Sequence, residues 1–89
     1  MELSERYIQK LEHEGYASVY EMFEDARASH ASQTRVTDTT LVVLEGSIKI
    51  LMGEDMRTLF TGDVCVIPAH VPYSYSAGPV GSKYIVGER

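Results

Sequence analysis

Apolar residues near the start of the chain recur with the period of a helix. Four of them fall at i, i+4, i+5 and i+8, which places them on a single stripe of a helical surface: Leu3, Tyr7, Ile8 and Leu11. Ser4 is a residue type that caps helix N-termini, and Gly15 is the type that most often follows a last turn. The pattern predicts a helix over residues 5–14. Its stripe is expected to pack on the rest of the chain or on a partner subunit.

From Tyr16 onward the apolar pattern changes to short runs and to alternation with period two, which is typical of strands. Turn residues separate these runs at Glu45-Gly46, at 53–55, at 61–63 and at 78–81, and a polar loop is expected over 25–32. Seven or eight short strands so spaced predict an all-β sandwich or barrel. The expected strands are 16–23, 33–36, 40–44, 47–52, 56–60, 64–67, 73–76 and 82–86.

Two segments carry a family resemblance. Val43-Leu44-Glu45-Gly46 is similar to the end of the first motif of the cupin superfamily, and Gly62-Asp63 through Ile67-Pro68-Ala69 is similar to the start of the second. The resemblance implies a small RmlC-like cupin: a double-stranded β-helix, or jelly-roll, barrel over residues 15–87, preceded by the helical segment 1–14. The whole chain, 1–89, is then one domain.

The resemblance also locates the positions at which such proteins usually hold a metal, with two His, a Glu and a third His. These positions carry Gln33, Arg35, Thr39 and Tyr73 here. None of them is an ordinary ligand of a first-row metal, and Arg35 adds a fixed positive charge. We therefore expect no metal at these positions, and the sequence indicates no cofactor.

The same four residues are expected to point into the barrel, because alternate strand residues face the same side. Arg35 would offer a forked donor to a carboxylate or phosphate, and Gln33, Thr39 and Tyr73 would complete the hydrogen bonds. This reading predicts a site for a small anionic metabolite. In the alternative reading Arg35 pairs with an internal carboxylate, Asp38 or Glu45, Tyr73 fills the cavity, and the barrel has a structural or partner-binding role.

A third reading is enzymatic. His70 follows Pro68-Ala69 and stands three residues before Tyr73, so the two could transfer protons in a metal-free isomerase, epimerase or lyase. Against this, His70 occupies a turn position where a solvated imidazole is common. His13 and His30 are expected at the surface, and Glu88 and Arg89 are expected to be solvated charges.

Composition narrows the class of protein. Of 89 residues, 44% are hydrophobic and 24% are charged, with 13 acidic against 8 basic residues and a net charge of −5. Without a Lys/Arg cluster, a nucleic-acid surface is not expected.

No apolar run approaches the roughly 20 residues of a membrane span, and the first six residues lack the regions of a signal peptide, so we expect a cytoplasmic protein. Open sheet edges favour a homodimer.

Overall fold

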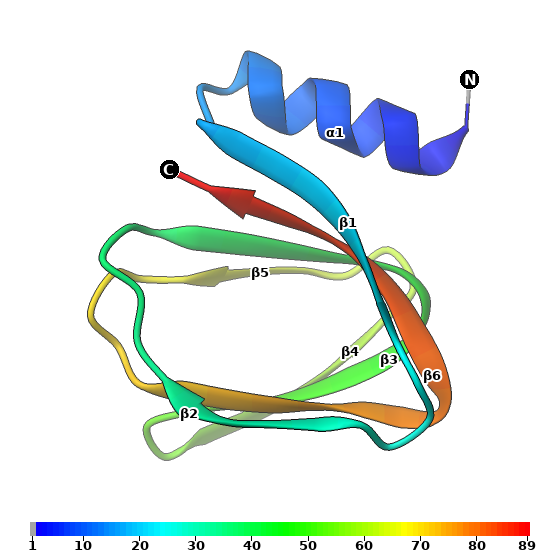
Figure 1. The fold of residues 1–89 in the computed structure, drawn as a ribbon, viewed down its shortest axis with the longest axis vertical. Coiled ribbons are helices and arrows are strands. Elements are labelled where there is room, and N and C mark those ends of the chain that lie inside the picture. Colours follow the sequence, from blue (N-terminus) through cyan, green and yellow to red (C-terminus); the bar gives the residue numbers. More distant parts are fainter. Residues whose placement is uncertain (1) are drawn as a thin grey trace.

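Two long strands, each shared by two sheets, organise the chain. The computed structural model describes residues 2–89 (Figure 1). It contains one helix and six strands: α1 Leu3–His13, β1 Ser18–Glu24, β2 Ser29–Gln33, β3 Thr39–Met52, β4 Asp55–Phe60, β5 Val64–Ile67 and β6 Tyr73–Glu88. All strand pairings are antiparallel.

The first sheet consists of β1, the second half of β6, the first half of β3, and β5. The second sheet consists of β2, the first half of β6, the second half of β3, and β4. The two sheets face each other as a sandwich, and β3 and β6 pass from one sheet to the other (Figure 1). The all-β jelly-roll prediction is confirmed.

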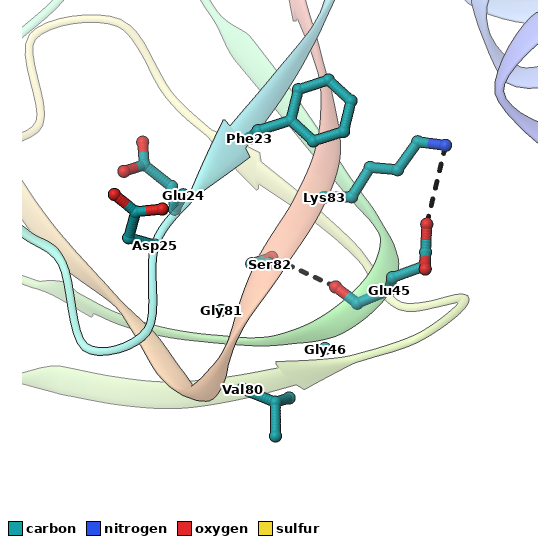
Figure 2. A pocket seen from close by; sticks show the side chains of 9 residues that line it. All are labelled: Phe23, Glu24, Asp25, Glu45, Gly46, Val80, Gly81, Ser82 and Lys83. Carbon is teal, nitrogen blue, oxygen red and sulfur yellow. Dashed lines mark hydrogen bonds and ion pairs between the residues drawn. The ribbon is translucent and has the colours of Figure 1, made fainter.

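Strands β3 and β6 cross from one sheet to the other at the two places where turns were predicted. We expected the chain to reverse at Glu45-Gly46 and again at 78–81, but β3 and β6 continue through both places. Gly46 and Gly81 have φ of 74° and 82°, and the β3–β6 register shifts beside Gly46, so the strands bend without losing their pairing. Figure 2 shows this bend from close by, where Ser82 Oγ donates to the Glu45 carbonyl at 3.3 Å.

The region between residues 25 and 38 also differs from the prediction. Strand β2 occupies Ser29–Gln33, so that its first four residues lie inside the expected loop, and the expected strand 33–36 does not form beyond Gln33. The inward residues of β2 are the polar His30 and Gln33, which pair in register with Tyr75 and Tyr73. Because its inner face is polar, the strand lacks the apolar alternation by which strands are recognised in a sequence.

The helix ends as predicted but begins differently. Gly15 has φ of 95°, its N–H donates to the Glu12 carbonyl, and the Tyr16 N–H donates to the Leu11 carbonyl, each at 3.1 Å, which is a Schellman motif. Ser4 does not cap the helix. The cap position belongs to Glu2, whose side chain makes no capping bond, and Ser4 lies buried in the first turn.

Two apolar clusters lie on opposite faces of the first sheet. The inner cluster fills the space between the sheets and includes the buried thiol of Cys65. The outer cluster joins Leu11, Tyr7 and Ile8 of α1 to Val42, Leu44 and Ile85. Three residues of the predicted stripe thus pack on the barrel, while the fourth, Leu3, is exposed. Within residues 2–89, no helix is long and apolar enough to cross a membrane.

Candidate functional site

Arg35 stands at one end of the barrel, in the connection between β2 and β3. Its Nε donates to the Tyr73 hydroxyl at 2.8 Å, and its Nη1 forms an ion pair with Glu88 Oε1. The backbone is held as well, because the His70 N–H donates to the Arg35 carbonyl at 2.8 Å. The hydrogen bond to Tyr73 is the main cause that raises the pKa of the Arg35 guanidinium, and the charge of Glu88 adds to it. The guanidinium is therefore a fixed cation.

The four residues of the predicted pocket share this end of the barrel. Arg35 and Tyr73 are in contact. Thr39 lies opposite Glu88 in the β3–β6 register and Gln33 lies opposite Tyr73 in the β2–β6 register. Thr39 is 1% exposed, and its Oγ1 has no hydrogen-bond partner within the part of the chain that the structure describes. A buried hydroxyl without a partner costs free energy, so Thr39 offers an unused polar contact.

The carboxylate that pairs with Arg35 is not one of the two expected. Asp38 Oδ1 accepts from the Ala69 N–H at 2.8 Å, and Glu45 lies 3.6 Å from Lys83 Nζ. The partner is Glu88, which we expected to be a solvated surface charge. That expectation was wrong because β6 was predicted to end at residue 86. The strand runs on to Glu88, and alternation then places this side chain inward with Tyr84 and Val86.

A hollow of about 470 Å³ lies outside this end of the barrel. It is bordered by Arg35 and Glu88, by a second cation, Arg89, and by three hydroxyl residues, Ser18, Thr34 and Thr37. Arg89 is held in place by its guanidinium, which lies 3.9 Å from the centre of the Tyr16 ring and donates to the Glu14 carbonyl at 2.8 Å. Two positioned cations and several hydroxyls therefore surround one carboxylate.

A second polar network, missed by the sequence reasoning, lies between the sheets. Glu24 Oε1 accepts from the Tyr84 hydroxyl at 3.0 Å and lies 2.8 Å from His30 Nε2. Tyr84 also lies within 3.3 Å of the Tyr75 hydroxyl, and the His30 ring stacks on Tyr75 with centroids 4.5 Å apart. Burial is the main cause that raises the pKa of both tyrosines well above the ordinary value. His30 was expected at the surface, but its ring stacks on Tyr75. The alternation of Tyr73 and Tyr75 along the sequence was the available signal that the strand facing them has a polar inner side.

His70 and Tyr73 are not joined by their side chains. Tyr73 is buried, and its hydroxyl accepts from Arg35. His70 is exposed, with φ of 66°, and none of the side-chain hydrogen bonds within residues 2–89 includes its imidazole. The geometry gives no direct proton path between the two residues.

The donors at this end of the barrel do not fit the metal that such barrels usually hold. Arg35 is already an ion-pair donor, and Tyr73 accepts its hydrogen bond. In the described part of the chain, no three His, Cys, Asp or Glu side chains are grouped so that they could hold a metal ion. The expectation about metal at these positions stays a prediction.

Comparison with known proteins supports the fold alone. No family model matches the chain, and neither does any curated protein. A cupin-like protein from Thermotoga maritima superposes with a TM-score of 0.73 at 25% identity, over 79% of this chain and 54% of that one. An RmlC-like cupin from Shewanella frigidimarina has a TM-score of 0.73 at 20% identity, over 79% and 62%. The DMSP lyase DddQ from Ruegeria pomeroyi has a TM-score of 0.74 at 21% identity, over 80% and 36%.

These likenesses define the class of fold: the chain folds as a small RmlC-like cupin barrel, as its two motifs predicted. It spans only about half to three fifths of the Thermotoga and Shewanella proteins and about a third of the lyase.

Proposed function

We propose that this cupin barrel binds a small carboxylate-bearing metabolite at its mouth, with Arg35 as the anchor. The observation that carries the proposal is the guanidinium of Arg35, positioned by Tyr73 and bordering a hollow that also contains Arg89 and hydroxyl groups. A planar guanidinium matches a carboxylate through paired N–H donors, and such charge-assisted bonds are strong. The hydroxyls of Ser18, Thr34 and Thr37 would fix the remainder of the ligand.

The packed interior supports a ligand at the mouth in preference to one deep in the barrel. Ile48 and Ile50 are fully buried and Tyr73 is 3% exposed, so the space between the sheets is occupied by side chains. The hollow outside Arg35 lies in front of this core. Thr39, just inside, would supply its unpartnered hydroxyl to a group that reached past Arg35.

Replacement of Arg35 should weaken this binding strongly. Arg35→Gln removes the charge and the fork, and the loss of a charge-assisted hydrogen bond corresponds to roughly a 10- to 100-fold rise in Kd. Isothermal titration with acetate, succinate and glucose 6-phosphate measures the effect. Arg6→Gln, an exposed cation on α1, is the matched control and should leave Kd unchanged. If neither acetate nor succinate binds, or if both variants behave alike, the proposal fails.

Glu88 should act as an internal competitor for the same guanidinium. Its carboxylate occupies Nη1 of Arg35, so a ligand carboxylate must displace it to bind through two N–H groups. Glu88→Gln keeps the shape and removes the charge, and we expect a severalfold fall in the Kd for succinate. The same titration series measures it. An unchanged or raised Kd would show that the ligand does not compete with Glu88.

The alternatives stay predictions. Proton transfer by Tyr73 and His70 would give an isomerase, epimerase or lyase, and turnover lost in both Tyr73→Phe and His70→Ala would support it. The lyase among the structural neighbours is at most a reason to test that chemistry. A homodimer, a partner-binding role and a cytoplasmic location also remain predictions, the first of them open to sedimentation analysis.

A further inference from the structure

The outer face of the second sheet carries a row of polar residues across four strands. Lys49 on β3 pairs in register with Thr58 on β4 and with Ser76 on β6, and Ser76 pairs in turn with Ser29 on β2. These side chains face outward, because Ile48 and Ile50 on either side of Lys49 belong to the inner core. Helix α1 covers the first sheet and leaves this face open (Figure 1).

A hollow of about 420 Å³ lies beside Lys49 on this face. Arg27 supplies a second cation, and Ser47, Thr58 and Ser76 supply hydroxyls. No Asp or Glu of residues 2–89 borders the hollow, and neither Lys49 nor Arg27 forms an ion pair with a carboxylate of that part of the chain. On a chain of net charge −5, two cations without an ion-pair partner at one hollow give this place a local positive potential.

The backbone at Arg27 is held in an unusual conformation. Its φ is 60°, a left-handed value that a residue with a side chain seldom adopts. Two hydrogen bonds fix it against β6: the Arg27 N–H donates to the Gly78 carbonyl at 3.0 Å, and the Ala77 N–H donates to the Ala28 carbonyl at 2.8 Å. Residues with such backbone conformations cluster at binding sites, and Arg27 is one of the residues that border the hollow.

The remaining border of the hollow is aromatic. Phe60 lies opposite Ser47 in the β3–β4 register and is 59% exposed, so its ring is available to a flat partner. Two cations, three hydroxyls and one exposed ring combine the contacts that a phosphate and a planar base require. We propose that this face binds a phosphate monoester that carries a flat ring, as in a nucleoside monophosphate.

This site is independent of the one at Arg35. Tyr73, which holds Arg35, faces the interior of the barrel, whereas Lys49 faces outward from the second sheet. A ligand can therefore occupy either place without the other. Substitutions in one site should not change binding at the other.

The test is a chemical-shift titration of the ¹⁵N-labelled chain with adenosine monophosphate, inorganic phosphate and adenosine. Adenosine monophosphate should shift the amides of Lys49, Thr58, Phe60 and Ser76 in a saturable way. Inorganic phosphate should shift the same amides more weakly, and added salt should weaken both. Shifts confined to the surroundings of Arg35, or no saturable shifts, would overturn the proposal.

Variants separate the phosphate contact from the ring contact. Lys49→Gln should raise the Kd of adenosine monophosphate by roughly tenfold or more, since it removes a charged donor. Phe60→Ala should weaken adenosine monophosphate but leave phosphate unchanged. Lys10→Gln on α1 is the control cation and should have no effect. An unchanged Kd in Lys49→Gln, or equal losses for both ligands in Phe60→Ala, would contradict the assignment.

Discussion

Replacing Gly46 by alanine should lower the free energy of unfolding by about 4 kcal/mol, the combined effect of a left-handed backbone and an overpacked contact. A Cβ at this position would lie 2.1 Å from the carbonyl oxygen of Gly81 and 3.0 Å from its carbonyl carbon. Both are backbone atoms of the paired strand, so no side chain can turn aside to relieve the clash. Urea unfolding followed by circular dichroism measures the loss.

Gly53→Ala is the matched control for this variant. Gly53 has φ of 59°, in the same region as Gly46, but nothing lies within 4 Å of the position that its Cβ would take. Its substitution should cost only the intrinsic penalty of the left-handed backbone, about 1 kcal/mol. Equal losses in the two variants would mean that the contact between Gly46 and Gly81 does not limit the bend.

Raising the pH above 10 should destabilise the barrel steeply. Burial is the main cause that raises the pKa of Tyr20, Tyr75, Tyr84 and Cys65. Each group stays protonated in the folded chain while it ionises in the unfolded chain, so its stabilising contribution is complete below the unfolded pKa and is lost as the pH rises through the folded one. A group that is ionised in the unfolded chain and still protonated in the folded chain contributes a slope of at most about −1.4 kcal/mol per pH unit, and the contributions of the four groups add. Urea unfolding between pH 8 and pH 11 gives this slope.

Two variants identify the source of the slope. Tyr84→Phe removes one buried phenol and should make the slope shallower by about 1.4 kcal/mol per pH unit above pH 10. Ile85→Val deletes a buried methyl group without a titratable proton; it should lower stability by about 1 kcal/mol at every pH and leave the slope unchanged. A slope in Tyr84→Phe equal to that of the parent chain would show that Tyr84 is not protected from ionisation.

The apolar strands were predictable and the polar-faced ones were not. Segments 40–44, 47–52 and 64–67 were found because one or both of their faces are apolar, and a buried sheet requires such a pattern. Strand β2 was missed because His30 and Gln33 on its inner side meet tyrosines from another strand. The sequence predicts turns where the structure has bends, at Gly46 and Gly81, since glycine signals a change of direction without distinguishing a hairpin from a bulge.

The nearness of Arg35 to Tyr73 was predictable from the sequence, but the pairing of Arg35 with Glu88 and most of the residues that border the hollow were not. Arg35 and Tyr73 were matched through the spacing of two motifs, and the structure brings them into contact. Glu88 was not foreseen as their neighbour, because the contact joins positions 53 residues apart along the chain. The contact between Arg35 and Glu88 is determined only by the register of β6 against β3, and this register follows from the packing of whole strands.

The sharing of β6 between both sheets sets the order in which the domain can be assembled. Strands β1, β2 and β3 all pair with β6, so none of them has its full set of neighbours until Tyr73–Glu88 is present. On the ribosome, the first 72 residues can form the helix and the β3–β4 and β3–β5 pairings, but neither sheet can be completed before β6 leaves the exit tunnel. Folding then depends on contacts of long sequence separation, which are slow to form. Until β6 arrives, the apolar faces of β3 are exposed to chaperones and to other unfinished chains.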